Sequence, residues 1–193
     1  MTAAPAVLFD QDQIAVRLRE IGAEVAREMA GREICVIGLI KGCMMFIADL
    51  VRVIPLDMTC HFLRVTSFRD EASGPVRTDI VYSTETTFEG RHILLLDDIV
   101  DTGITLNFLL DHIRERRPGT LKVCTLIDKP DCRKIEVQID WAAFTMKESM
   151  ADRFLVGYGL DHAERYRGLP YIGTIPRPAP PAEGRTITIS PGS

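Results

Sequence analysis

The sequence predicts an α/β fold in which a central, mostly parallel sheet is flanked by helices. Two kinds of observation predict it. Ile34–Ile40 and Ile93–Leu96 are apolar without alternation, as expected for strands buried on both faces of a sheet. Segments with helical periodicity separate such runs, and the connections between them are short. The length of 193 residues, 46% of them hydrophobic, suits one domain with a substantial core.

The first half of the chain begins with a predicted helix. Ile14, Leu18, Ile21 and Val25 recur at helical spacing, with Asp10 as the expected N-cap and Gly31 beyond the end. After the strand at 34–40, the pattern predicts a helix over 44–54, strands over 61–65 and 78–83, and a polar, turn-rich segment over 67–75 between these strands.

The second half contains the clearest strand–loop–helix unit. The pattern predicts a strand over 92–96, a loop over 97–103, a helix over 106–113, and strands over 122–127, 139–144 and 154–158. We expect residues 1–175 to form a single domain. The Pro-rich tail over 176–193 is expected to be extended or mobile. The pattern at 185–189 would also suit a further edge strand.

Composition narrows the class of protein. The net charge of −4, from 23 Lys and Arg against 27 Asp and Glu, argues weakly against a nucleic-acid partner. The longest apolar runs are strand-sized, and the N-terminus lacks the features of a secretion signal, so no membrane partner is expected. Five scattered cysteines without metal-ligand spacing disfavour a disulfide framework and structural zinc. We therefore expect a reduced, cytoplasmic protein.

The strongest chemical pattern follows the strand at 92–96. In an open α/β sheet, ligands bind outside the carboxyl ends of the strands, and here Asp97, Asp98 and Asp101 occupy that place. Gly103 and the start of a helix beyond them suit a phosphate, whereas the carboxylates suit sugar hydroxyls or a divalent metal. An Asp-rich helix cap would explain the same residues without a ligand. No Gly-Lys-Ser/Thr follows, so the segment is not a Walker A loop.

Residues 94–105, Leu-Leu-Leu-Asp-Asp-Ile-Val-Asp-Thr-Gly-Ile-Thr, resemble the phosphoribosyl-diphosphate motif of type I phosphoribosyltransferases. The wider chain, from about Ile14 to Ile175, resembles the hypoxanthine–guanine branch of that family. Four further segments match in order: Gly38–Gly42 with Phe46–Leu50, Ser67-Phe68, Cys124–Pro130, and Phe154–Asp161 with Tyr166-Arg167 beyond.

The resemblance implies a fold, a reaction and a set of partners. The fold would be a central sheet with a small hood and a mobile lid loop. The reaction would transfer 5-phosphoribosyl from 5-phospho-α-D-ribose 1-diphosphate to N9 of hypoxanthine or guanine, giving IMP or GMP and pyrophosphate in purine salvage. The implied cofactor is Mg²⁺, and the implied assembly is a homodimer or homotetramer.

The resemblance also assigns residues. Asp101 matches the catalytic acid or base near purine N7. The positions that match the phosphoribosyl-diphosphate site are Lys41, Gly42, Asp97, Asp98, Asp101, Thr102, Gly103, Ile104, Thr105 and Arg167. Those that match the purine site are Lys129, Phe154, Leu155 and Asp161, and those that match metal-binding acids are Asp97, Asp98 and Asp161. Within these sets, Lys129 matches the donor to the C6 oxygen and Phe154 the ring that stacks on the base.

Ser67 and Phe68 match the lid, and the peptide bond between Ile40 and Lys41 is predicted to be cis, as it can be in the family. The chain also departs from the family. Asp97 replaces the more usual Glu, Phe68 replaces a Tyr, and Met146–Asp152 is several residues longer than the usual connection. The lengthened connection lies next to the purine segment, where it can alter base preference or assembly.

Three other readings compete with a hypoxanthine–guanine enzyme. A signalling receiver domain also places acids and a lysine at strand ends, but its acidic pair would follow the first strand. An RNA-binding regulator on the same fold should show a basic face, which the net charge of −4 does not support. A xanthine-preferring enzyme remains open, whereas Lys129 disfavours adenine.

Overall fold

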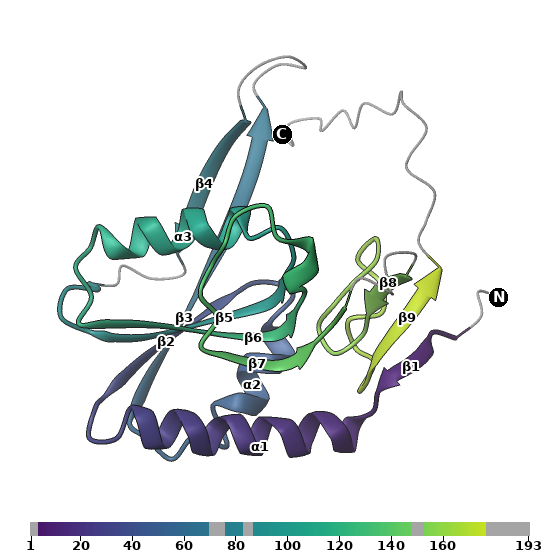
Figure 1. The fold of residues 1–193 in the computed structure, drawn as a ribbon, viewed down its shortest axis with the longest axis horizontal. Helices are drawn as coiled ribbons and strands as arrows, with labels where there is room; N and C mark the ends of the chain where they lie inside the picture. The colour runs from purple at the N-terminus through teal and green to yellow at the C-terminus, as the bar shows by residue number, and fades with distance from the viewer. Residues whose placement is uncertain (1–3, 70–75, 83–86, 148–152, 177–193) are drawn as a thin grey trace, which may run out of the picture.

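The computed structural model describes residues 4–69, 76–82, 87–147 and 153–176, and Figure 1 shows how their helices and strands are arranged. In chain order these are β1 (Ala6–Phe9), α1 (Gln11–Glu28), β2 (Ile34–Leu39), α2 (Met44–Leu50), β3 (Met58–Arg69), β4 (Val76–Tyr82), β5 (His92–Val100), α3 (Ile104–Arg114), β6 (Thr120–Asp128), a 3₁₀ turn η1 (Pro130–Cys132), β7 (Trp141–Thr145), β8 (Arg153–Val156) and β9 (Ile172–Pro176).

The larger sheet has six strands in the order β4-β3-β2-β5-β6-β7. All neighbouring pairs are parallel except β3 and β4, which pair antiparallel at one edge. The predicted mostly parallel sheet is therefore confirmed. Because five strands run in the same direction, the segments that follow them lie along one edge of the sheet.

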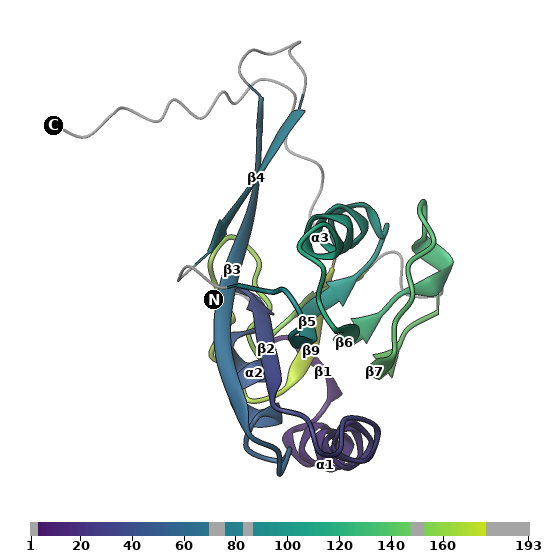
Figure 2. The same ribbon diagram turned by 90° about the vertical axis from the view of Figure 1, so that its left-hand side faces the viewer.

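Two cores cover the two faces of this sheet, with α1 and α2 on one side and α3 on the other (Figure 2). Successive side chains of β5 alternate between them. Leu94 and Leu96 pack in the core with α1 and α2, while Ile93 and Leu95 pack in the core with α3. This arrangement explains the unbroken apolar runs, since a strand covered on both faces has no solvent-facing side.

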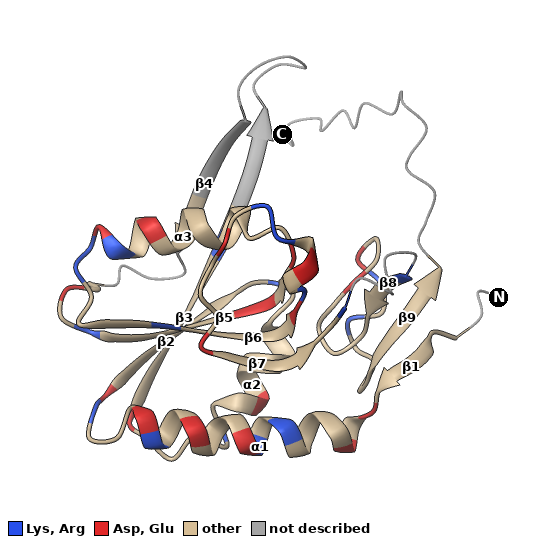
Figure 3. Cartoon of the chain, in the orientation of Figure 1, with Lys and Arg blue, Asp and Glu red and all other residues tan. Residues whose placement is uncertain are grey.

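Helix α1 begins at the predicted cap. The Asp10 carboxylate accepts a hydrogen bond from the Gln13 amide at 2.8 Å, and the Gln13 side chain accepts one from the Asp10 amide at 2.9 Å. The predicted apolar face of α1 is buried, whereas other positions of the helix carry a mixture of basic and acidic residues (Figure 3). Among the described residues, no helix has the length and apolar character needed to cross a membrane.

A second sheet of three strands, in the order β1-β9-β8, forms the small hood expected from the resemblance. Both pairings are antiparallel. Strands β1 and β9 lie near opposite ends of the described chain, and they pair with Ala6 opposite Thr174. The ring of Phe9, at the end of β1, stacks on Phe144 of β7 with 3.8 Å between centroids. This contact joins the hood to the larger sheet.

Several predicted bounds were wrong. Strand β5 continues through Asp97 and Asp98 to Val100, where a loop was predicted, because its ladder with β6 extends as far as Val100 opposite Asp128. Helix α2 ends at Leu50, short of the predicted end at residue 54. Strands β1 and β9 were not predicted. Residues 70–75 of the expected lid, residues 148–152 of the lengthened connection and the tail from 177, with its expected edge strand, lie outside the described residues.

Candidate active site at the carboxyl ends of the parallel strands

Four segments far apart in the sequence meet at the carboxyl-end edge of the larger sheet. They follow β2 at residues 40–43, β5 at 101–105, β6 at 129–130 and β8 at 157–167. The second and third are joined directly, because the Lys129 amide donates to the Val100 carbonyl at 3.0 Å. The first and fourth touch at their glycines, where Gly159 lies against the carbonyl of Gly42. The edge predicted for the site is therefore where these segments converge.

Asp97 and Asp98 form a buried carboxylate pair at the end of β5. Asp97 is only 7% exposed, and its Oδ1 accepts a hydrogen bond from the Asp98 amide at 2.9 Å. Asp98 Oδ1 in turn accepts from the Ile99 amide at 2.8 Å. Burial raises the pKa of both carboxyls, and the nearby carboxylate of Asp98 raises the pKa of Asp97 further. Such a pair favours ligands that bring hydroxyl donors or positive charge.

Gly42 lies directly under this pair. A Cβ atom at Gly42 would fall 1.4 Å from Asp98 Oδ2, so that only glycine allows the carboxylate to approach the backbone this closely. The peptide bond between Ile40 and Lys41 is cis, as predicted. The segment after β2 therefore brings its backbone against the acids of β5.

The loop that follows β5 forms a small concavity before α3. Gly103 has a φ of 79°, which suits glycine, and α3 begins at Ile104 without a side-chain cap. The cavity has a volume of about 100 Å³ and is lined by Asp97, Ile99, Val100, Asp101, Thr102, Gly103, Thr105 and Leu106. Amide groups at a helix start, beside a residue with positive φ, attract an anion the size of a phosphate.

A larger pocket of about 410 Å³ adjoins this loop and shares Asp101 with it. All four predicted purine-site residues line it, together with Asp98. The pocket residues are Asp98, Ile99, Asp101, Lys129, Cys132, Arg153, Phe154, Leu155, Leu160 and Asp161. A cavity of about 460 Å³ between α1 and α2 is larger but contains none of the predicted site residues, so we place the chemistry in the pocket that does.

Phe154 supplies the aromatic wall of this 410 Å³ pocket. Its side chain is 36% exposed, although most aromatic residues on strands are buried. Its ring meets that of His162 edge to face, with 5.3 Å between centroids. Leu155, the next residue, is buried, with 4% of its surface exposed. A ring that is held on one edge and accessible to the pocket can stack on a planar base.

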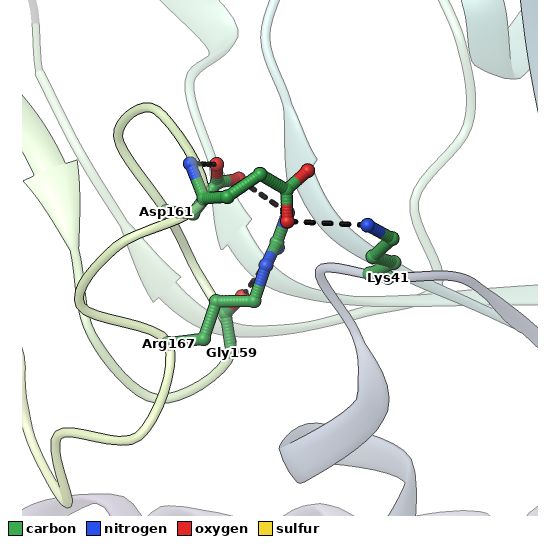
Figure 4. Close-up of polar contacts among 5 residues, drawn as sticks. Lys41, Gly159, Asp161 and Arg167 are labelled. Carbon is green, nitrogen blue, oxygen red and sulfur yellow. Dashed lines mark hydrogen bonds and ion pairs between the residues drawn. The ribbon is translucent and has the colours of Figure 1, made fainter.

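Two cations, Lys41 and Arg167, lie beside the contact between Gly42 and Gly159, and both are paired with acids of the chain (Figure 4). The Lys41 Nζ pairs with the Glu164 carboxylate at 3.1 Å. Arg167 pairs with Asp161 at 2.7 Å and with Glu164 at 3.3 Å, and donates to the Gly159 carbonyl at 2.8 Å. Lys41 is the main cause of the lowered pKa of Glu164, and Arg167 adds to it.

The three acids predicted to bind metal are not assembled into one ligand cluster. Asp98 and Asp161 line the same pocket, whereas Asp97 faces the smaller cavity, and Asp161 is paired with Arg167. Within the described ranges, no group of three or more His, Cys, Asp or Glu side chains could hold a metal ion. The paired carboxylates still fit Mg²⁺, which is commonly held by one or two carboxylates together with substrate phosphates rather than by a protein cage.

Some predicted residues are not brought to these cavities, and others were missed. Ser67 and Phe68 lie on β3, opposite Thr78 and Arg77 of β4, and their side chains are outside the described part of the structure. Sequence reasoning missed Glu164. Its only signal was an acid three residues before Arg167, which is common on any surface.

Arg133 was missed as well. It follows η1, and its guanidinium donates to the backbone of the loops that end β5 and β6. The segment it belongs to also supports the phosphate-sized cavity, since the amides of Lys134 and Ile135 donate to the Thr102 carbonyl at 2.9 and 3.1 Å. No local pattern indicated these contacts.

Comparison with known proteins gives concordant matches. The family model described as "Phosphoribosyl transferase domain" matches residues 7–163. The hypoxanthine-guanine phosphoribosyltransferase of Bacillus subtilis is 38% identical over 169 residues, which cover 88% of this chain and 92% of that protein. The hypoxanthine phosphoribosyltransferase of Haemophilus influenzae is 36% identical over 172 residues, which cover 88% of this chain and 94% of that protein. A crystal structure of a hypoxanthine-guanine phosphoribosyltransferase from Bacillus anthracis superposes with a TM-score of 0.78 at 35% identity, covering 90% of this chain and 99% of that one.

Proposed function

The chain belongs to the phosphoribosyltransferase family, and from this premise we propose how its site makes a nucleotide. It is a purine-salvage enzyme that transfers 5-phosphoribosyl from 5-phospho-α-D-ribose 1-diphosphate to N9 of a 6-oxopurine, hypoxanthine or guanine. The products are IMP or GMP and pyrophosphate.

The base occupies the 410 Å³ pocket in this proposal. Phe154 stacks on the ring, and the main chain at Leu155 meets its edge. Lys129 donates to the oxygen at C6, which selects oxopurines over aminopurines. Asp101 exchanges a proton with N7, on the same side of the purine as that oxygen. The observation that carries the proposal is that Asp101 and Lys129 line one pocket with an accessible aromatic ring.

The donor spans the two cavities and the contact between Gly42 and Gly159. The 5-phosphate takes the cavity at residues 101–105, which Thr102, Gly103 and Thr105 line. Main-chain amides at the start of α3, with Ile104 as its first residue, would bind the phosphate there. Asp97 and Asp98 bind the ribose hydroxyls, and their negative charge favours the positive character that develops at the anomeric carbon. The diphosphate lies toward Lys41, Gly42 and Arg167.

Asp97, Asp98 and Asp161 would hold Mg²⁺ together with oxygens of the diphosphate. The ion would stabilise the charge on the departing pyrophosphate. Asp161 would contribute at the purine side, since it lines the base pocket. Ser67 and Phe68, on β3 next to the lid segment, would close over the donor.

The proposal is tested with purified protein, Mg²⁺, the diphosphate donor and the three bases hypoxanthine, guanine and xanthine in competition. Nucleotide formed from hypoxanthine or guanine supports it, and a strong preference for xanthine would support the alternative enzyme. Absence of nucleotide from all three bases would overturn it. An RNA-binding regulator would instead show salt-dependent RNA binding, although the mixture of charges along α1 offers no basic face there (Figure 3).

Residues 1–175 are proposed to act as one unit and 176–193 as an appended Pro-rich tail. The five cysteines are free thiols, which supports a reducing compartment such as the cytoplasm. A homodimer or homotetramer remains part of the proposal, and sedimentation equilibrium would distinguish the two.

A further inference from the structure

The residues proposed to meet the purine edge, Asp101 and Lys129, are on different loops. These loops follow β5 and β6, which are neighbours in the sheet, with Val100 opposite Asp128 as the last pair of their ladder. Beyond that pair the backbones are joined by the hydrogen bond from the Lys129 amide to the Val100 carbonyl. The amides of Lys134 and Ile135 also donate to the Thr102 carbonyl, but none of these three main-chain bonds is made by Asp101 itself.

Arg133 makes the additional connection. The two N–H groups of its terminal nitrogen Nη1 are shared among three carbonyls, those of Val100 at 2.5 Å, Asp101 at 2.6 Å and Lys129 at 3.3 Å. The other terminal nitrogen is paired with the carboxylate of Asp128. One guanidinium therefore contacts the backbone of both proposed purine contacts and the last residue of β6.

This guanidinium is buried behind the loops rather than exposed to a ligand. The Arg133 side chain is 6% exposed and that of its partner Asp128 is 16% exposed. Arg133 lines neither the 410 Å³ pocket nor the 100 Å³ cavity. The Arg133 Cδ atom lies 3.4 Å from the position that a Cβ atom of Gly103 would occupy. The side chain therefore packs against the loop at residues 101–105. Arg133 therefore contacts the loops and lies outside both cavities proposed to hold the substrates.

We propose that Arg133 is a positioning residue that sets the distance between Asp101 and Lys129, and with it the geometry of proton exchange at purine N7. This inference rests on the proposed function. A guanidinium suits the role because its planar fork presents several donors in fixed directions, whereas lysine offers one compact charge that cannot reach all four acceptors. A displacement near 1 Å at a reacting centre lowers the rate by about 100-fold.

The test compares Arg133→Lys with Arg17→Lys. Arg17 is a matched control, because its guanidinium also bridges two carbonyls, those of Ala142 and Ala143, at 3.0 and 3.1 Å, but on β7 away from the pocket. For each variant we would measure kcat, the KM values for donor and base, the pH profile of kcat and the thermal midpoint. Arg133→Ala assayed with and without added guanidinium ion provides a rescue experiment.

We expect Arg133→Lys to lose about 100-fold in kcat, with the KM for the donor changed less than threefold and the pH profile altered. Arg17→Lys should keep the wild-type kcat and profile. Guanidinium should restore part of the activity of Arg133→Ala. A wild-type kcat and pH profile in Arg133→Lys would overturn the inference, as would equal losses in Arg17→Lys. If the wild-type protein made no nucleotide, the proposed function itself would be overturned.

Discussion

Gly159 offers a sharp test of how the glycine contact supports the donor site. A Cβ atom at this position would lie 2.1 Å from the Gly42 carbonyl oxygen, and contacts below 3.0 Å are essentially never observed for real Cβ atoms. In Gly159→Ala one of the two backbones must therefore move by about 0.9 Å. The φ of 97° at Gly159 adds a backbone strain energy of about 1–2 kcal/mol when the residue carries a side chain.

A movement of this size at a substrate-binding loop corresponds to a loss of about 100-fold in rate. We expect kcat/KM for the diphosphate donor to fall by that factor in Gly159→Ala. The control is Gly90→Ala, at a φ of 71° with no atom within 4 Å of the added carbon. It carries comparable strain in a turn before β5 and should lower the thermal midpoint while kcat/KM changes less than threefold.

The assay is steady-state kinetics with varied donor and saturating hypoxanthine, together with thermal unfolding of each variant. The reasoning is refuted if Gly159→Ala keeps the wild-type kcat/KM, since the two backbones would then adapt without disturbing the site. It is refuted equally if Gly90→Ala loses as much activity, because strain alone would then account for the effect.

Four further predictions concern charged groups of the site. Asp101→Asn should lower kcat by about 10²–10⁴-fold while the dissociation constant of the donor, measured by calorimetry, stays within threefold. Lys129→Ala should raise the KM for hypoxanthine and narrow its advantage over adenine in a competition assay. The pKa of Asp97 is raised by burial, so the folded protein keeps a proton that the unfolded chain loses near pH 4. Its free energy of unfolding therefore falls as pH rises from about 4 through the raised pKa, and urea titrations should show Asp97→Asn gaining stability relative to wild type over that window. Glu164→Gln should lower the dissociation constant of pyrophosphate by about two- to fivefold, as for the loss of exposed ion pairs, and higher salt should reduce the difference.

Much of the fold could be predicted from local patterns, because burial on one or two faces leaves a period in the sequence. Helix α1 was predicted from its buried stripe and its Asp10 cap, and β2 from a run that is apolar on both faces. Strand β1 had no such signal, since it has four residues and its first two are exposed. Its pairing partner β9 is more than 160 residues away, so only the assembled hood specifies it.

Some residues of the candidate site could likewise be predicted from local patterns, and others could not. The acids after β5 could be predicted to form a site because strand ends collect ligands in an open sheet. Lys129 and Phe154 were assigned to the purine site only by resemblance, since no local feature distinguishes them from an ordinary loop lysine or strand aromatic. Arg133 and Glu164 were missed because part of their contacts is made far along the chain. Arg133 contacts the Asp101 carbonyl 32 residues away, and Glu164 contacts Lys41 123 residues away.

The pairing of Glu164 with Lys41 and Arg167 has a consequence for how the diphosphate would bind and how pyrophosphate would leave. A carboxylate of the chain already pairs with these cations. In the proposed site, arrival of the diphosphate would therefore be an exchange of one anion for another rather than a simple addition. The same exchange runs backwards after the transfer. Glu164 belongs to the same chain as the cations, so it would compete with pyrophosphate at an effective concentration that dilution does not change. In the proposed site, the carboxylate would therefore promote dissociation of pyrophosphate in dilute and concentrated solution alike.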